Sequence, residues 1–227
     1  MKLAAVVQAR MSSTRFPGKM LHVVRGKPLL EYVLDRARLS EHIDLVVVAT
    51  SVESTDTPIA TYCAASGVEC FRGSLGDVAG RFLEACELYE LDAFVRICGD
   101  SPLLDAALID RGVQEFLESG ADVVTNVSPR TFPAGQSVEV VRTTVFRDAC
   151  ARMTRAEHFE HVTGFLYQHA REYRIHNFTN PAGNESEIDL SVNTPAGMSL
   201  FERLIEHGED TPALPATLTR YRAMACS

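Results

Sequence analysis

Short apolar runs alternate with longer segments of helical periodicity through the first half of the chain. Runs of this length without polar alternation are typical of buried parallel strands. The longer segments carry apolar residues three and four apart, as amphipathic helices do. Together the two patterns favour a doubly wound α/β domain with a mostly parallel sheet and helices on both faces. They predict strands at 3–7, 45–49, 68–71, 94–98 and 123–127, and helices at 29–37, 55–66, 77–90 and 106–118.

The alternation of apolar runs and helical segments becomes less regular after residue 126. We interpret residues 127–186 as a small inserted α+β subdomain within one domain spanning 1–227, covering the mouth of the sheet. The last residues of the chain have weak patterning and are expected to fray. The sequence after residue 126 predicts a loop at 128–135, strands at 138–141, 173–178 and 190–192, and a polar linker at 180–187. It also predicts helices near 144–153, 156–170 and 195–207.

Composition narrows the class of protein. With 227 residues and 46% hydrophobic side chains, the chain can build one large core. Its formal net charge of -8 argues against general nucleic-acid binding. No apolar run approaches membrane-spanning length and no signal peptide is evident, so a cytoplasmic location is expected. Six cysteines lack a CxxC pair and are interpreted as buried, reduced thiols: Cys63, Cys70, Cys86, Cys98, Cys150 and Cys226.

Positive charge gathers in the loop after the first strand, residues 8–19, although the protein is acidic. The first acidic residue of the chain is Glu31, and the loop itself carries Arg10, Arg15 and Lys19. Small hydroxyl residues lie between these cations, and backbone N–H groups, hydroxyls and cations together suit a polyphosphate. A basic surface loop with a proline turn is the alternative. Phosphate binding is favoured because the loop directly follows a buried strand.

A second polar loop, residues 99–102, follows the strand at 94–98. Ligands of open parallel sheets bind beyond the carboxyl ends of the strands, where the strand order reverses. Asp100 should therefore face the same crevice as the basic loop, and Mg²⁺ would relieve its repulsion from bound phosphates. Alternatively, Asp100 caps the helix that follows. The sequence leaves these two interpretations open.

Several standard motifs are missing. The first strand–helix turn has no GxGxxG, which argues against a dinucleotide dehydrogenase. Gly18 and Lys19 lack the earlier glycine and the following Ser or Thr of the ATPase loop. His158 and His161 are three apart, but a zinc site would need a further ligand that is not identifiable, so a polar helix face is favoured. No Ser/His/Asp or Cys/His catalytic arrangement is recognisable.

Motifs in order along most of the chain resemble one known family. They are QARMSSTRFPGK at 8–19, GKPL at 26–29, VATS at 48–51, FRGS at 71–74 followed by Asp77-Val78, RICGDSPL at 96–103, PRTFP at 129–133, EHVT at 160–163 and VNTP at 192–195. This set closely resembles the cytidylyltransferases related to spore-coat polysaccharide biosynthesis proteins and acylneuraminate cytidylyltransferases.

The resemblance implies a Rossmann-like nucleotidyltransferase fold, use of CTP with Mg²⁺, a small sugar-like acceptor and a homodimer. It implies catalytic roles for Arg10, Lys19 and Asp100. It implies nucleotide binding by Gln8, Ala9, Arg10, Ser12, Ser13, Arg15, Lys19, Thr50, Ser51, Arg72, Gly73, Ser74 and Asp77. It implies acceptor binding by Arg130, Glu139, Glu160 and His161, and metal binding by Asp100, with Asn193 and Asp189 as further candidates.

Three positions depart from the family pattern. Relatives usually carry Asp where this chain has Asn193, and that Asp is the expected second metal ligand. A basic residue is common where Asp189 stands, and an Asp where Ser137 stands. All three departures lie on the acceptor side, so an unusual acceptor, or nucleotide binding without turnover, is an alternative. A glycosyltransferase ranks last, because its Asp-x-Asp metal motif is missing at Asp100.

Overall fold

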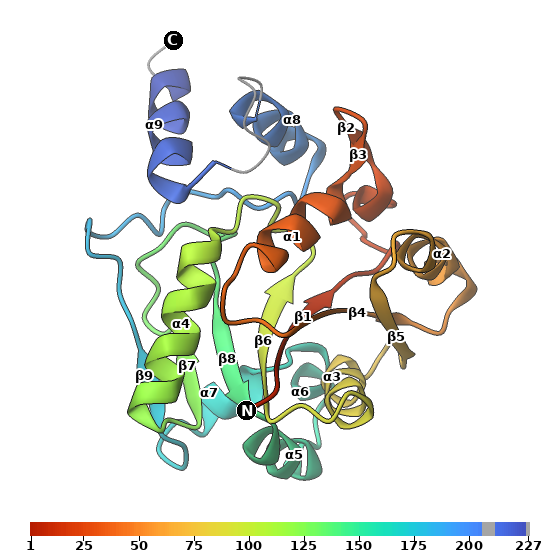
Figure 1. Ribbon diagram of the computed structural model, residues 1–227, viewed down its shortest axis with the longest axis vertical. Helices are drawn as coiled ribbons and strands as arrows, with labels where there is room; N and C mark the ends of the chain where they lie inside the picture. Colours follow the sequence, from red (N-terminus) through yellow and green to blue (C-terminus); the bar gives the residue numbers. More distant parts are fainter. Residues whose placement is uncertain (206–211, 226–227) are drawn as a thin grey trace.

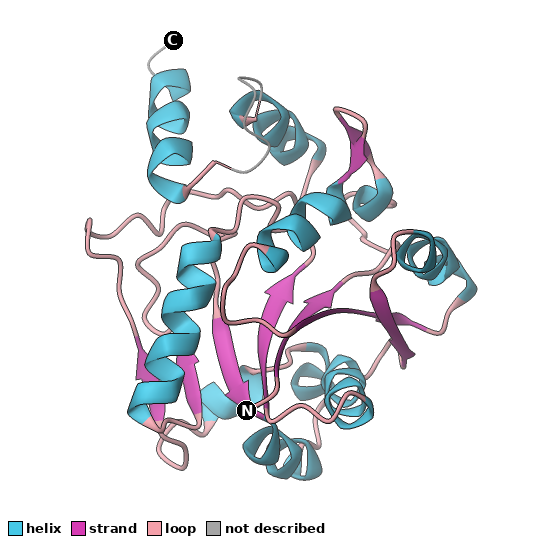
Figure 2. Ribbon diagram, viewed as in Figure 1, coloured by secondary structure: helices cyan, strands magenta, loops and turns pink. Residues whose placement is uncertain are grey.

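A computed structural model describes residues 1–205 and 212–225. Its centre is a twisted seven-stranded sheet with helices on both faces (Figures 1 and 2). The strand order is β5-β4-β1-β6-β8-β7-β9, and all neighbours are parallel except the two pairs that β8 makes. The strands are β1 Leu3–Gln8, β4 Leu45–Ser51, β5 Glu69–Gly73, β6 Ala93–Cys98, β7 Val123–Thr125, β8 Glu139–Arg142 and β9 Ile175–Asn177. The predicted α/β class and its mostly parallel sheet are confirmed.

Two apolar layers flank the sheet because its buried strands carry apolar side chains on both faces. Helices α1 and α4 cover one face in Figure 1, and α3, α5, α6 and α7 lie on the other. The helices are α1 Leu29–Arg38, α2 Thr57–Ala65, α3 Val78–Leu88, α4 Ala106–Ser119, α5 Thr143–Arg152, α6 Ala156–Glu160, α7 Gly164–Gln168, α8 Pro195–Leu204 and α9 Leu214–Ala225. Short pieces complete the chain: 3-10 turns η1 Lys19–Leu21 and η2 Ser54–Asp56, and a hairpin of β2 Val23–Val24 and β3 Lys27–Pro28.

The strand order reverses between β1 and β6. From β1 the chain adds β4 and β5 on one side, and then returns to place β6 on the other. Gly99 follows β6 at this point, and its N–H donates to the Gln8 carbonyl oxygen at 2.9 Å. A Cβ at residue 99 would lie 2.7 Å from that oxygen, so only glycine fits. The carboxyl ends of β1 and β6 are thus held close together.

The predicted insertion, residues 127–186, is built into the main sheet. Its strand β8 lies between β6 and β7, and β9 extends the edge beyond β7. The helix expected at 156–170 is interrupted, because residues 161–163 separate α6 from α7. The strand expected at 190–192 is absent among the described residues, and only an isolated bridge between Ala134 and Asp189 forms there.

The carboxyl-terminal region is more ordered than its sequence pattern indicates. Fraying was expected there, but Leu214 to Ala225 form α9. Leu214 and Leu218 are buried against the main core, and the Leu214 N–H donates to Asp105 at 2.6 Å. These contacts join residues far apart in sequence, which local patterning does not reveal. The end of the helix predicted to reach His207 and the sixth cysteine, Cys226, lie outside the described residues.

Candidate active site

The basic loop after β1 is closed by its own backbone. The Gly18 N–H donates to the Met11 carbonyl at 3.0 Å, and Gly18 has φ +76°, a left-handed conformation that favours glycine. The Ser13 hydroxyl accepts from the Phe16 N–H at 3.4 Å. The chain then enters the short turn η1 with Lys19 and Met20 buried. This folding directs Lys19 inward from a loop that is otherwise largely accessible.

A buried carboxylate, Asp56, ties the loop to the neighbouring strand. It accepts the Met11 N–H at 2.7 Å and also hydrogen bonds with the backbone N–H and hydroxyl of Ser51. Asp56 stands at the N-cap position of α2, but its side chain makes no cap hydrogen bond. Its carboxylate instead fixes the start of the loop beside the end of β4.

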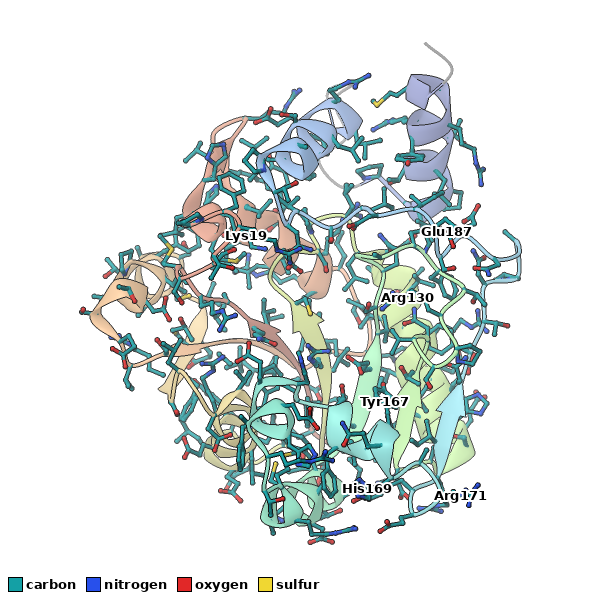
Figure 3. The ribbon with its side chains drawn as sticks, turned by 180° about the vertical axis from the view of Figure 1, so that it is seen from behind. Lys19, Arg130, Tyr167, His169, Arg171 and Glu187 are labelled. Atoms are coloured by element: carbon teal, nitrogen blue, oxygen red, sulfur yellow. The ribbon has the colours of Figure 1, made fainter. Side chains whose placement is uncertain are left out.

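Lys19 joins three segments that are distant in sequence (Figure 3). Its Nζ donates to Asp100 Oδ2 at 3.1 Å, to the Val192 carbonyl at 2.9 Å and to Asn193 Oδ1 at 3.2 Å. Asp105, rather than Asp100, caps the next helix by accepting the Ala107 N–H. The helix-cap interpretation of Asp100 is therefore wrong, and its carboxylate faces the basic loop.

A cavity of about 200 Å³ opens at the reversal point between β1 and β6. We call it the switch-point cavity. Three cationic side chains of the opening loop and Asp100 face it together, as expected for a site that receives a charged ligand. Its lining consists of Gln8, Arg10, Ser13, Thr14, Arg15, Lys19, Met20, Arg96, Cys98, Gly99, Asp100 and Asn193.

Oxygen donors for a divalent cation converge at one wall of this cavity. Asp100 Oδ2 and Asn193 Oδ1 both lie within 3.2 Å of the Lys19 ammonium, so one cation already bridges them. A carboxylate and an amide oxygen beside an open cavity fit Mg²⁺, which completes its shell with phosphate oxygens and water. The described residues contain no cluster of three His, Cys, Asp or Glu side chains that could hold a metal alone.

Asp189 does not line the switch-point cavity. Its exposed carboxylate accepts from the Ser191 N–H at 2.8 Å and from the Ser191 hydroxyl. The Ser191 oxygen in turn accepts from Asn193 Nδ2 at 2.8 Å. This chain of contacts leaves Asn193 Oδ1 directed at Lys19. The structure thus connects Asp189 to Asn193 through a serine, whereas the sequence argument considered it as a direct metal ligand.

The second predicted nucleotide segment is bonded mainly to itself. Arg72 donates to the Ser51 and Glu53 carbonyls at 2.9 Å each, and Asp77 accepts the Gly80 N–H as the cap of α3. Thr50 and Ser51 are fully buried. The switch-point cavity is not lined by any residue of this segment, which comprises Thr50, Ser51, Arg72, Gly73, Ser74 and Asp77. Two predicted nucleotide-binding residues of the opening loop, Ala9 and Ser12, do not line it either. Their nucleotide contacts stay predictions.

The predicted acceptor residues are dispersed. Glu160 pairs with Arg10 at 3.2 Å and so reaches the rim of the opening loop. Arg130 donates to the Ser137 hydroxyl at 3.0 Å, and Figure 3 shows it well away from Lys19. His161 is exposed just after α6, while His158 is buried, so the two histidines do not share a face. Their roles toward an acceptor stay predictions.

Glu139 is buried behind the cavity in a saturated network. One carboxylate oxygen accepts from Arg96 at 2.6 Å, and the other accepts from Thr163 at 2.7 Å and Tyr167 at 2.5 Å. The Tyr167 hydroxyl oxygen is also hydrogen bonded to the Thr125 hydroxyl, with 3.0 Å between the two oxygens. We call these five residues the Glu139 network. Burial alone raises the pKa of Glu139, but the charge of Arg96 and the hydrogen bonds from Tyr167 and Thr163 outweigh it and lower that pKa.

Two contributors to the site were missed by sequence reasoning. Arg96 lines the cavity, yet it was passed over because it lies in an apolar strand. A single charge inside a buried strand is itself a signal, since such a charge must find a partner. Asp56 is the second missed contributor. No local pattern pairs it with Met11, 45 residues earlier.

Comparison with known proteins adds a decisive observation. The family profile described as Cytidylyltransferase matches residues 4–206. This chain belongs to the cytidylyltransferase family. The predicted resemblance is therefore confirmed, and the switch-point cavity lies within the matched region.

The matches to two relatives and one solved structure cover nearly the whole length of this chain. Uncharacterized protein MJ1063 of Methanocaldococcus jannaschii is 32% identical over 91% of this chain and 84% of its own. Spore coat polysaccharide biosynthesis protein SpsF of Bacillus subtilis is 28% identical over 93% and 90%. The solved structure of a cytidylyltransferase from Leptospira borgpetersenii matches with a TM-score of 0.94 and 26% identity, covering 100% of this chain and 96% of that one.

The fold extends to more distant proteins. The structure of CMP:2-keto-3-deoxy-manno-octonic acid synthetase complexed with CTP gives a TM-score of 0.71 at 17% identity, covering 92% of this chain and 100% of that one. At this identity the likeness establishes the nucleotidyltransferase fold. No helix in the described part of the chain is long and apolar enough to cross a membrane.

Proposed function

We propose that this chain transfers the cytidylyl group of CTP to a hydroxyl of a sugar or sugar-acid-like acceptor and releases pyrophosphate. The acceptor oxygen attacks the α-phosphorus, and the bond from that phosphorus to the oxygen bridging the β-phosphate breaks. Pyrophosphate departs with the bonding electrons, and the hydroxyl proton is lost to a base or to water. The name of the SpsF relative supports a place in making activated sugars for a surface polysaccharide.

One observation carries this proposal: cations and a carboxylate line the same small cavity at the strand-order reversal. Arg10, Arg15 and Lys19 come from one loop, and Asp100 comes from the neighbouring strand end. Fixed cations stabilise the transition state of phosphoryl transfer most where negative charge accumulates, which is on the oxygens of the leaving pyrophosphate. Ser13 and Thr14 add hydroxyl donors along the same wall.

Mg²⁺ would be held by Asp100 and Asn193 together with phosphate oxygens. When bound, it would neutralise phosphate charge and polarise the phosphorus that is attacked. The chain's own residues have a separate task. Lys19 currently bonds both oxygen donors, and a triphosphate entering the cavity offers its ammonium a new anionic partner. Lys19 thereby holds the leaving group, and Arg10 and Arg15 orient it from the loop.

Pyrophosphate release tests the proposal. Purified protein is incubated with CTP, Mg²⁺ and a panel of sugars, sugar acids and sugar phosphates, and pyrophosphate is measured by a coupled assay. Release that requires both CTP and one acceptor class is expected. ATP, GTP and UTP serve as matched controls. No release with any acceptor, combined with no CTP binding in calorimetry, contradicts the proposal.

Asn193 favours a second candidate, a protein that binds CTP without turnover. Asn193 supplies an uncharged oxygen where relatives usually carry Asp, and Lys19 already bonds it at 3.2 Å. This candidate predicts CTP binding without pyrophosphate release. The variant Asn193→Asp separates the two functions: a gain of release only in the variant favours the binding protein. Homodimer formation and a cytoplasmic location stay predictions, to be checked by light scattering and by fractionation.

A further inference from the structure

A chain of hydrogen bonds connects the exposed Asp189 carboxylate to the wall of the switch-point cavity. Asp189 Oδ1 accepts from the Ser191 hydroxyl at 2.5 Å, and the Ser191 oxygen accepts from Asn193 Nδ2 at 2.8 Å. Asn193 Oδ1 then accepts from Lys19 Nζ at 3.2 Å, and these last two residues line the cavity. We call Asp189, Ser191 and Asn193 the Asp189 relay. It joins the protein surface to the site through every second residue of one short segment.

Hydrogen-bonding capacity fixes the direction of the Asp189 relay. An ionised carboxylate only accepts, an ammonium only donates, and a serine hydroxyl has one proton to give. Because Ser191 gives that proton to Asp189, its oxygen can only accept from Asn193, which must present its amide nitrogen there. The amide oxygen is left to face Lys19. Turning the amide over would place its NH₂ group against the ammonium and its oxygen against a lone pair of Ser191.

The orientation of this amide matters most once Lys19 has turned to the triphosphate. In the proposed function, Asn193 Oδ1 then becomes an oxygen donor to Mg²⁺, and only the Ser191 end of the amide still specifies which atom faces the cavity. An aspartate at position 193 would need no such help, because both oxygens of a carboxylate are equivalent. A basic residue at position 189 could not accept from Ser191. Asp189 and Asn193 are therefore chemically matched to each other.

Backbone contacts hold the segment independently of these side chains. The Val192 N–H donates to the Asp100 carbonyl at 2.8 Å, which ties the two segments that carry the oxygen donors. Gly135 has φ +87°, and a Cβ there would lie 2.9 Å from the Ser191 nitrogen and 3.0 Å from the Leu190 carbonyl carbon. Removing the Ser191 hydroxyl should therefore leave the path of the backbone unchanged and free only the orientation of the amide.

We infer, on the basis of the proposed function, that Asp189 and Ser191 are positioning residues for the metal site. They keep the Asn193 amide oxygen directed at the cation that Asp100 and Asn193 would hold. Ser191 accepts from the amide nitrogen, and Asp189 holds the serine proton away from it. The charge of Asp189 adds to this effect, because hydrogen bonds in a chain polarise one another. An uncharged asparagine thereby becomes a more effective oxygen donor.

A turn closed by Asp189 alone is the competing explanation. The Asp189 carboxylate also accepts the Ser191 N–H at 2.8 Å, a common turn in which an Asp side chain bonds to the backbone two residues later. A matched turn lies just before it, where the Asn184 side chain accepts the Ser186 N–H at 3.0 Å. Such a turn does not use the serine hydroxyl, whereas the Asp189 relay depends on it. Variants of the two serines therefore separate the explanations.

NMR of the free, ¹⁵N-labelled full chain tests the orientation without nucleotide or metal. The side-chain NH₂ signal of Asn193 is assigned by its loss in Asn193→Asp. Ser191→Ala should shift this signal and accelerate exchange of its protons with water by roughly two- to tenfold, the range for one hydrogen bond. Ser191→Thr, which keeps the hydroxyl, and the control Ser186→Ala should change neither property. An unchanged Asn193 signal in Ser191→Ala overturns the inference.

Calorimetry tests the consequence for the cation. The measured quantity is the ratio of the CTP Kd in EDTA to the CTP Kd with Mg²⁺. Ser191→Ala should lower this ratio by roughly two- to tenfold, and Ser191→Thr should restore it. In the Asn193→Asp background, Ser191→Ala should leave the ratio unchanged, because a carboxylate needs no orientation.

The outcomes distinguish the positioning role from the proposed function. An equal loss of the ratio in both backgrounds would indicate a merely structural role for Ser191 and overturns the inference. A wild-type protein whose CTP affinity Mg²⁺ does not raise overturns it as well. A wild-type protein that gives the expected NMR response but binds no CTP contradicts the proposed function, while the orientation of Asn193 by the Asp189 relay stands.

Discussion

Two of the acid–base pairs beside the cavity, Lys19–Asp100 and Arg96–Glu139, are held in different ways. In Lys19–Asp100 the carboxylate side chain is 26% exposed, and its oxygen shares one ammonium with two other acceptors. In Arg96–Glu139 the carboxylate is 3% exposed and accepts from three side chains. The first pair can exchange partners when a ligand enters, while the second is fixed. An ion pair at one wall of the cavity is thus suited to exchange its partner for a ligand, and an ion pair at the other wall is suited to hold the structure rigid.

The most damaging change should be Glu139→Ala. Removing one partner of a buried ion pair leaves an uncompensated charge, so the free energy of unfolding should fall by about 3–5 kcal/mol. Chemical denaturation monitored by circular dichroism measures it. The pair between the exposed Arg174 and Asp122 supplies the control: Arg174→Ala should lower the free energy of unfolding far less than Glu139→Ala does. Similar losses in both variants would contradict the contrast drawn between buried and exposed pairs.

Asp100→Ala should impair turnover strongly and stability only slightly. We expect turnover to fall by roughly a hundred- to a thousandfold, about 3–4 kcal/mol, while the free energy of unfolding changes by about 1 kcal/mol or less. The reason is that the Asp100 side chain is 26% exposed and pairs with a single ammonium. Pyrophosphate release and denaturation are measured on the same preparation. Loss of the fold would show that this pair is as fixed as the other.

Lys19→Ala should weaken the binding of a nucleoside triphosphate more than the binding of a monophosphate. The ammonium lies on the loop assigned to the leaving group, so CTP affinity should fall roughly tenfold or more, and CMP affinity much less. Calorimetric titration with each nucleotide gives the ratio. Equal losses for CTP and CMP would mean that Lys19 does not contact the β- or γ-phosphate.

The smallest effect concerns pH. The pKa of Glu139 is lower in the folded protein than its ordinary value of about 4.3 in an unfolded chain. Its stabilising contribution is therefore complete above that value, and is lost as the pH falls through it toward the lower pKa of the folded state. Denaturation of the wild type and of Glu139→Gln should show curves that converge below pH 4.3. Curves that stay parallel through this range would argue against the lowered pKa.

The two walls of the cavity also differ in how well the sequence predicts them. The loop with Lys19, the Asp100 loop and their meeting beyond the strand ends follow from strand patterning and one topological rule. The Glu139 network does not, because its members come from β6, β7, β8, α7 and the loop before α7. Pairings across such separations depend on register, which neither composition nor periodicity contains. Arg96 belongs to the motif at 96–103, but nothing in the sequence pairs it with Glu139.

The outer elements illustrate the same limit. The fifteen-residue helix expected at 156–170 breaks into α6 and α7, and Thr163 in the break donates to Glu139. Amphipathic spacing alone does not reveal that Thr163, in the break between α6 and α7, contacts Glu139. The helix α9 was missed for a related reason, because its order comes from burial of Leu214 and Leu218 against distant parts of the core.

Gly99 restricts how this pocket can be remodelled. Any side chain there would collide with the Gln8 carbonyl at 2.7 Å and with the Met20 sulfur at 2.9 Å. The floor between β1 and β6 is therefore closed to enlargement and to new functional groups. A pocket that adapts to a larger or differently shaped molecule must change its walls instead, which come from the opening loop, from the residues that flank Gly99 and from Asn193. Tolerance to substitution should accordingly be unequal around the cavity, with almost none at its base and most of it along the loops that surround the opening.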